Sequence, residues 1–221
     1  MNILIIGASR GIGLEFVRQY RAEGDAVWAT ARDEAGLARL RELGATALKL
    51  DVTDASSVSG LAWQIDGVAF DVAIVNAGVI GPRDAALGPP SQADFDAVMH
   101  TNVLGPMRVL PQLAEALAPA ARVAVLSSRM GSIGSRSNGS VWLYRASKAA
   151  LNSVLKDASL TLDGRATCIA FHPGWVRTDM GGAGADIGVD ESVSGMRSVL
   201  AGLTPADNGR FINFDGTPIP W

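Results

Sequence analysis

Short apolar segments alternate with longer segments of helical periodicity along the chain, and no other feature constrains the fold as much. Seven of the short segments are typical of β-strands, and they cover residues 2–6, 26–31, 46–50, 72–76, 122–127, 166–171 and 210–213. A segment that fits a helix follows each of the first six. Strands and helices in this order form βαβ units, in which a right-handed crossover joins two parallel strands. We therefore expect a parallel sheet.

Several predicted strands are apolar at consecutive positions rather than at alternate ones. Residues 3–6 read Ile-Leu-Ile-Ile, residues 72–75 read Val-Ala-Ile-Val and residues 123–126 read Val-Ala-Val-Leu. A strand is apolar on both sides where helices cover both faces of its sheet. No repeat, low-complexity tract or linker divides the 221 residues. The sequence thus predicts one α/β domain over residues 1–221, a Rossmann-type doubly wound parallel sheet of about seven strands with helices on both faces.

The composition argues against several classes of protein. Nineteen basic and 22 acidic side chains give a formal net charge of −3, so the chain has no strong positive field for nucleic acid or anionic lipid. The one cysteine, Cys168, cannot form an internal disulfide, and with two histidines it cannot build a cysteine–histidine zinc cluster. No apolar run is long enough to cross a bilayer, and residues 1–6 lack a signal-peptide pattern. We expect a cytoplasmic protein with no metal, no nucleic-acid partner and no membrane partner.

The first βα turn has the glycine spacing of a dinucleotide-binding turn. Gly7, Gly11 and Gly13 follow the pattern G-x-x-x-G-x-G directly after the first predicted strand. Glycines at these positions let the backbone approach a pyrophosphate at the N-terminus of a helix. A chain with 25 glycines contains such a spacing by chance fairly often, so its place after the first strand gives the motif its weight.

The end of the second predicted strand bears on the choice of cofactor. An acidic residue there would hold the ribose 2′-OH of NAD, but the strand ends at Ala31 and Arg32 follows. Arg32, with Arg10 of the glycine turn, would offer two guanidinium groups to the 2′-phosphate of NADP. The alternative is that both arginines are solvated surface residues, and Asp33 keeps NAD(H) open. The residues favour NADP(H).

The pair Tyr144 and Lys148 is the most specific signal in the chain, which contains only two tyrosines and three lysines. Residues four apart share a helix face. An ammonium beside a phenol favours the phenolate and would lower its pKa toward the range of a general acid–base group. The alternative is an exposed pair on a helix surface. Ser127 and Ser128 close the fifth predicted strand and would place a hydroxyl nearby, although serine pairs are also common in turns.

Taken in order, these residues resemble the short-chain dehydrogenase/reductase family. The resemblance covers the whole chain and includes the glycine turn, Asn76-Ala77-Gly78, Asn102, Ser128, Tyr144-x-x-x-Lys148 and Pro173-Gly174. Residues 177–182, 191–193, 209–211 and 218–221 resemble its C-factor and sniffer-type carbonyl reductase branch.

The resemblance implies a catalytic set of four residues. Tyr144 would donate a proton to a carbonyl or accept one from an alcohol, and Ser128 would hydrogen-bond the substrate oxygen. Lys148 would bind the nicotinamide ribose and lower the pKa of the tyrosine. Asn102, in a helix interrupted by Gly105-Pro106, would hold a water that connects Lys148 with solvent. The residues themselves leave open whether Ser127 or Ser128 points at the substrate, and the family pattern favours Ser128.

The resemblance also implies a cofactor site at the ends of the strands. Its expected members are Gly7, Ser9, Arg10, Gly11, Ile12, Gly13, Arg32, Asp51, Val52, Asn76, Ala77, Gly78, Tyr144, Lys148, Pro173, Gly174, Val176 and Thr178. Among them, Thr178 would contact the carboxamide of the nicotinamide.

Two loops are expected to shape the substrate site. Residues 181–188 contain four glycines, so residues 181–194 are expected to form a flexible substrate lid, with an ordinary connection as the alternative. The loop over residues 131–141 is longer than is common in the family. Trp142, Trp175 and Met180 are expected to line an apolar pocket, although core packing explains the tryptophans equally well.

Together these features predict an NADP(H)-dependent oxidoreductase. It would reduce an aldehyde, ketone or quinone, or oxidise the matching alcohol, with Tyr144 as the general acid–base group. The alternative is a C-factor-like nucleotide-binding signalling or interaction protein with little turnover. The predicted helix over residues 146–162 has an apolar stripe wider than one core-facing side, which favours a homodimer.

Overall fold

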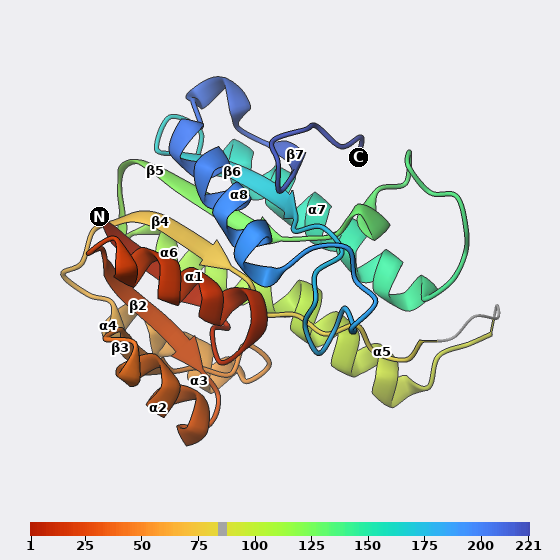
Figure 1. Ribbon diagram of the computed structural model, residues 1–221, viewed down its shortest axis with the longest axis horizontal. Coiled ribbons are helices and arrows are strands. Elements are labelled where there is room, and N and C mark those ends of the chain that lie inside the picture. The colour runs from red at the N-terminus through yellow and green to blue at the C-terminus, as the bar shows by residue number, and fades with distance from the viewer. Residues whose placement is uncertain (84–87) are drawn as a thin grey trace.

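A seven-stranded parallel sheet forms the centre of the computed structural model, which describes residues 1–83 and 88–221. Its strands lie in the order β3-β2-β1-β4-β5-β6-β7 (Figure 1). They are β1 (Asn2–Ile6), β2 (Ala26–Ala31), β3 (Thr46–Lys49), β4 (Phe70–Val75), β5 (Leu117–Leu126), β6 (Ala166–His172) and β7 (Arg210–Asn213). Each strand pairs in parallel with its neighbours.

Helices cover both faces of the sheet. They are α1 (Gly11–Ala22), α2 (Glu34–Glu42), α3 (Ala55–Ser59), α4 (Leu61–Gln64), α5 (Gln92–Met99), α6 (Gly105–Ala114), α7 (Trp142–Thr161) and α8 (Val189–Gly202). One apolar core takes buried residues from α1, α2 and α8, and the other takes them from α3, α4, α6 and α7. The predicted Rossmann-type doubly wound fold of about seven parallel strands is confirmed.

The central strands contain runs of consecutive apolar residues because their side chains pack into both cores. Leu4 and Ile6 of β1 belong to the core under α6 and α7, whereas Ile3 and Ile5 belong to the core under α1 and α8. All four side chains are fully buried. Successive side chains of a strand point to opposite faces, so the run Ile-Leu-Ile-Ile fits only a sheet that is covered on both sides.

The strand order changes direction between β1 and β4, and this point places the site. From β1 the chain moves outward through β2 to β3, and it then returns to β4 on the other side of β1. Ile6 pairs with Val75 at the carboxyl ends of these two strands. The loops that follow them diverge and leave a crevice, which is where ligands bind in open α/β sheets.

The observed strands match the predicted ones closely except at β5. This strand begins at Leu117 rather than at residue 122, and its register with β4 shifts between Phe70 and Val72. Ala120 has a φ of 59°, in the left-handed region. The sequence Ala-Pro-Ala around this bulge lacks the apolar, β-branched residues that mark a strand.

Two further expectations change with the structure. Residues 189–194, expected in the flexible lid, form the first turns of α8, because Val193 packs into the core. The loop therefore ends at Gly188. The apolar stripe of α7 is largely used inside the molecule, since Leu151, Leu155 and Leu162 belong to the core and Val154 and Ala158 pack against it. The stripe no longer indicates a partner surface, and the homodimer stays a prediction.

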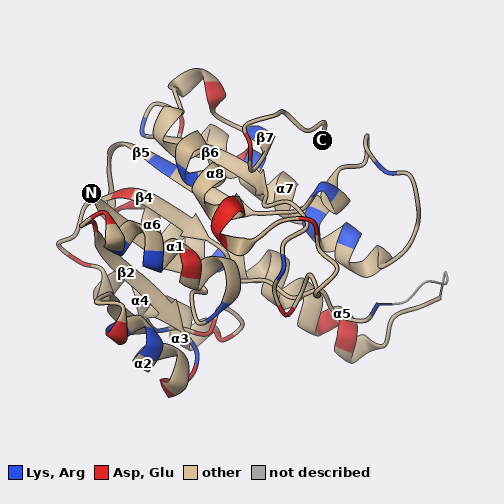
Figure 2. Ribbon diagram, in the orientation of Figure 1, with Lys and Arg blue, Asp and Glu red and all other residues tan. Residues whose placement is uncertain are grey.

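Basic and acidic side chains are interspersed along the ribbon, as Figure 2 shows. None of the described helices combines the length and apolar character that a membrane span requires.

Candidate active site

The glycine turn between β1 and α1 is shaped by contacts that leave no room for side chains. Gly7 has a φ of 86°, and a Cβ there would lie 2.8 Å from Ala77. A Cβ on Gly13 would lie 2.3 Å from the Gly7 carbonyl oxygen. The Gly7 amide donates to the Thr30 hydroxyl at 2.9 Å, which fixes the turn against β2. The turn thus brings the first amides of α1, which lack partners inside the helix, to the crevice, and this geometry fits a pyrophosphate.

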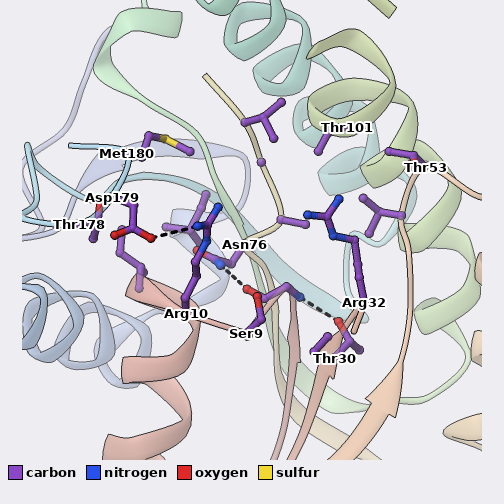
Figure 3. A pocket seen from close by; sticks show the side chains of 18 of the residues that line it. Ser9, Arg10, Thr30, Arg32, Thr53, Asn76, Thr101, Thr178, Asp179 and Met180 are labelled. Carbon is purple, nitrogen blue, oxygen red and sulfur yellow. Dashed lines mark hydrogen bonds and ion pairs between the residues drawn. The ribbon is translucent and has the colours of Figure 1, made fainter. Parts of the chain in front are cut away.

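One cleft runs along the carboxyl ends of the strands (Figure 3). Most of the expected cofactor residues line it: Gly7, Ser9, Arg10, Ile12, Arg32, Asp51, Val52, Asn76, Ala77, Gly78, Tyr144, Lys148, Pro173 and Thr178. Gly11, Gly13, Gly174 and Val176 do not line it. Val176 is buried, and the backbone amide of the next residue, Arg177, donates to the Ile187 carbonyl. Val176 therefore belongs to the backbone that supports the loop after β6.

Some lining residues were missed by the sequence analysis. Thr30, Val79 and Thr101 also line the cleft. Thr30 lies one position before the end of β2, so the rule that strand ends meet at one edge would have found it. Val79 and Thr101 carry no signal in the sequence, because only the fold brings their loop and helix together.

The two arginines of the cofactor region have different surroundings. Arg10 Nη1 forms an ion pair with Asp179 Oδ2 at 3.0 Å, and both side chains are largely exposed. Arg32 lines the cleft and forms no ion pair among the described residues. Asp33 is the N-cap of α2, where its carboxylate accepts from the Gly36 amide at 2.7 Å. Asp33, the residue on which binding of NAD(H) would depend, therefore caps a helix.

Tyr144 and Lys148 are buried and line one end of the cleft, and Ser128 is buried beside the tyrosine without lining it. Their exposed fractions are 7%, 3% and 7%. Burial raises the pKa of Tyr144 to about 12, and a hydrogen bond with Ser128 opposes that shift. Lys148 Nζ donates to the Leu126 carbonyl at 2.7 Å and lies 5.7 Å from the centre of the tyrosine ring. Burial lowers the pKa of Lys148 to about 8. At neutral pH the phenol is protonated and the amine is mainly cationic.

The expected direction of the tyrosine pKa is wrong for this structure. A nearby ammonium was expected to lower the pKa of Tyr144, yet burial dominates and raises it. The Lys148 ammonium is directed at the Leu126 carbonyl rather than at the phenol oxygen. Removal of water disfavours the phenolate more than the cation favours it.

The two serines at the end of β5 face different ways. Ser127 lines the cleft and Ser128 does not, but the Ser127 hydroxyl already donates to Asn152 Oδ1 of α7 at 2.5 Å. Ser128 lies against Tyr144 and accepts from the Met130 amide at 3.2 Å. The geometry therefore favours Ser128 as the hydroxyl beside the phenol.

Asn102 lies in a π-helical turn, His100–Leu104, directly before α6. The helix expected to be interrupted by Gly105-Pro106 instead continues through them as α6, and it is distorted in the preceding turn, where Pro106 supplies no amide for a helical hydrogen bond. The fully buried Asn102 side chain donates to the Val79 carbonyl and the Ser147 hydroxyl, at 2.8 and 2.9 Å. It thus connects the loop after β4 with α7. Its role in holding a water stays a prediction.

The expected substrate residues divide into two groups. Met180 lines the cleft. Trp142 and Trp175 do not, and with exposed fractions of 38% and 53% they are not core residues either. Trp175 Nε1 donates to the Gly181 carbonyl at 2.9 Å, which fixes the indole to the glycine-rich loop. No group of histidine, cysteine and acidic residues suited to a metal is found in the part of the chain that the structure describes.

Comparison with known proteins gives consistent relatives. The family model for short chain dehydrogenases matches residues 1–186. The C-signal protein of Myxococcus xanthus is 44% identical over 155 residues, which cover 68% of this chain and 92% of that protein. The 1-hydroxy-2-glutathionyl-2-methyl-3-butene dehydrogenase of a Rhodococcus species is 33% identical over 233 residues, covering 100% and 99% of the two chains.

Solved structures agree over the full length. A short-chain dehydrogenase/reductase from Burkholderia multivorans with bound NADP superposes with a TM-score of 0.90 at 33% identity, and the match covers 100% of this chain and 99% of that one. The carbonyl reductase Sniffer of Drosophila melanogaster has a TM-score of 0.88 at 31% identity, with the same coverage. The chain therefore belongs to the short-chain dehydrogenase/reductase family of NAD(P)-dependent oxidoreductases.

Proposed function

We propose that this protein is an NADP(H)-dependent carbonyl reductase. It would reduce an aldehyde, ketone or quinone to the alcohol, or catalyse the reverse oxidation. The observation that carries the proposal is the buried pair of Tyr144 and Lys148, which lines the end of a cleft that begins at the glycine turn, with Ser128 beside the phenol. Solved relatives named as carbonyl reductases support the reaction class.

NADPH, when bound, supplies the hydride that reduces the carbonyl carbon. Tyr144 would donate the proton to the carbonyl oxygen, and its high pKa keeps the phenol protonated for that step. Ser128, already beside the phenol, would donate a hydrogen bond to the same oxygen. Lys148 would hold the ribose of the cofactor, and its cationic form would stabilise the phenolate left after proton transfer.

The preference for NADP(H) is supported by charge around the cleft. Arg32 follows β2 and has no carboxylate partner among the described residues, so its guanidinium is available to a 2′-phosphate. Asp33 is engaged as a helix cap. Relatives solved with bound NADP support the same choice.

A second function deserves a direct test because C-signal is the more identical of the two relatives compared above. The protein would then bind a nucleotide and act as a signalling or interaction protein with little turnover. A binding protein has no need of a buried phenol beside an amine, so the Tyr144 and Lys148 arrangement favours the enzyme.

Binding and turnover measured side by side distinguish the two functions. NADPH and NADH are titrated by fluorescence, and NADPH oxidation is then followed with a panel of aldehydes, ketones and quinones. The proposal predicts tighter binding of NADPH and turnover of at least one class of carbonyl. Binding without turnover of any panel member would favour the signalling alternative, and the absence of dinucleotide binding would refute both.

A further inference from the structure

The ion pair between Arg10 and Asp179 joins two distant parts of the chain across the mouth of the cleft. Arg10 belongs to the glycine turn and Asp179 to the loop after β6, and the charged atoms are 3.0 Å apart. Both residues line the cleft. Their side chains are 73% and 77% exposed, so solvent screens the pair and it is weak. A competing anion of higher charge can replace the carboxylate.

Asp179 and Arg32 lie on opposite sides of Arg10 (Figure 3). In Figure 3 the Arg10 guanidinium points toward Asp179, on the side of the cleft away from Arg32. A 2′-phosphate carries close to two negative charges and several acceptor oxygens, which suit two guanidinium groups at once. Arg10 bonds Asp179 through Nη1, so a phosphate beside Arg32 would compete with Asp179 for the charge of the same guanidinium.

The loop that carries Asp179 is bonded mainly to itself. The Gly182 amide donates to the Thr178 carbonyl at 2.8 Å, and Arg177 Nη1 donates to the carbonyls of Ala185 and Asp186 at 3.0 Å. Another tie across the cleft is the hydrogen bond from Arg83 to the Met180 carbonyl. Loss of the Arg10 ion pair would therefore remove one of the few side-chain contacts that hold this loop against the cofactor side of the cleft.

We propose that Asp179 competes with the 2′-phosphate of NADP(H) for Arg10 and so determines how strongly the protein prefers NADP(H) over NAD(H). The inference rests on the proposed function, since it requires a dinucleotide in this cleft. Because coupling between two sites is reciprocal, the 2′-phosphate also loosens the loop over residues 178–188 when it takes Arg10. A cofactor without that phosphate leaves the ion pair in place.

Dissociation constants for NADPH and NADH test the competition. They are measured by fluorescence for the unsubstituted protein, Asp179→Asn, Arg10→Gln and the double variant. Asp186→Asn is the matched control, because it removes one exposed carboxylate from the same loop without touching Arg10. NADH reports any effect that does not involve the 2′-phosphate.

Asp179→Asn is expected to tighten NADPH binding by about two- to fivefold, the range for one exposed ion pair. NADH binding should stay within experimental error, Asp186→Asn should leave the ratio unchanged, and the gain should vanish in the Arg10→Gln background. Unchanged or weaker NADPH binding would overturn the proposal. So would an equal gain for NADH, or the same gain without Arg10.

Amide hydrogen exchange tests the coupling to the loop. At saturating cofactor, residues 179–188 should exchange faster with NADP⁺ than with NAD⁺, and Asp179→Asn should remove that difference. Equal exchange with the two cofactors would overturn the coupling. If neither dinucleotide binds the unsubstituted protein, the proposed function fails as well. If both bind and Asp179→Asn leaves the ratio of the NADPH and NADH dissociation constants unchanged, only the role of Asp179 is refuted.

Discussion

His172 should make the folded protein less stable as the pH falls from 7 to 5. It ends β6, directly before the Pro173-Gly174 turn, and its Nδ1 is buried with no partner among the described residues. Burial, with a smaller effect of Arg129, lowers the pKa of His172 from 6.5 to about 4, and Asp215 opposes the shift. The folded state therefore binds this proton less tightly than the unfolded state does.

The size of the effect follows from these two pKa values. Between pH 6.5 and 4 the unfolded chain binds more protons at this site, so the free energy of unfolding falls as the pH falls through that window. From pH 7 to pH 5 the loss is at most about 2 kcal/mol. The carboxyl groups of Asp54, Asp207 and Asp215 have pKa values lowered below 3.8, so they titrate outside this range.

Urea denaturation at pH 7 and pH 5 measures this loss. His172→Gln should remove most of it, because the substituted side chain does not titrate. His100→Gln is the matched control, since His100 is exposed. In this variant the unfolding free energy should fall between pH 7 and pH 5 as much as in the unsubstituted protein. An equal pH dependence in the unsubstituted protein and in His172→Gln would show that His172 does not cause the loss of stability.

Two further substitutions test the walls of the site. Gly13→Ala would place a Cβ 2.3 Å from the Gly7 carbonyl oxygen, so the turn must open, and we expect a loss of about 1–3 kcal/mol in unfolding free energy together with weaker NADPH binding. Gly202→Ala, where the added Cβ meets nothing within 4 Å, should change NADPH affinity little, and equal effects of the two would contradict the steric argument. Ser132→Ala removes a fully buried hydroxyl that donates to the Pro220 carbonyl at 2.5 Å and accepts from the Ser135 amide at 3.0 Å, and loss of the two hydrogen bonds is expected to cost about 1–3 kcal/mol in urea denaturation. Ser135→Ala, at an exposed position of the same loop, should cost much less, and a similar loss in both variants would show that the buried hydroxyl does not hold the loop.

The strands and the glycine turn were predictable because each depends on local residues. Four consecutive apolar residues in β1 can be buried only between two helical layers, and Gly7 and Gly13 mark a turn that tolerates no Cβ. The start of β5 was not predictable, since the bulge at Ala120 breaks the apolar pattern.

The electrostatics of the site depend on packing that spacing does not reveal. The pair Tyr144 and Lys148 was identified from its spacing, but the direction of the phenol pKa follows from burial. Arg10 and Asp179 are 169 residues apart in the chain, and only the fold brings them together. Trp175 was expected in a pocket, yet its indole bonds the backbone of a surface loop.

The role of Tyr144 as the proton donor is measured by the rate of NADPH-dependent carbonyl reduction in Tyr144→Phe. Tyr20→Phe is the matched control, because Tyr20 is the other tyrosine of the chain and packs in the core beside α8. We expect Tyr144→Phe to lower kcat by about 10²- to 10⁴-fold, with NADPH still bound, while Tyr20→Phe retains turnover. A Tyr144→Phe variant that reduces the carbonyl at the full rate would contradict that role.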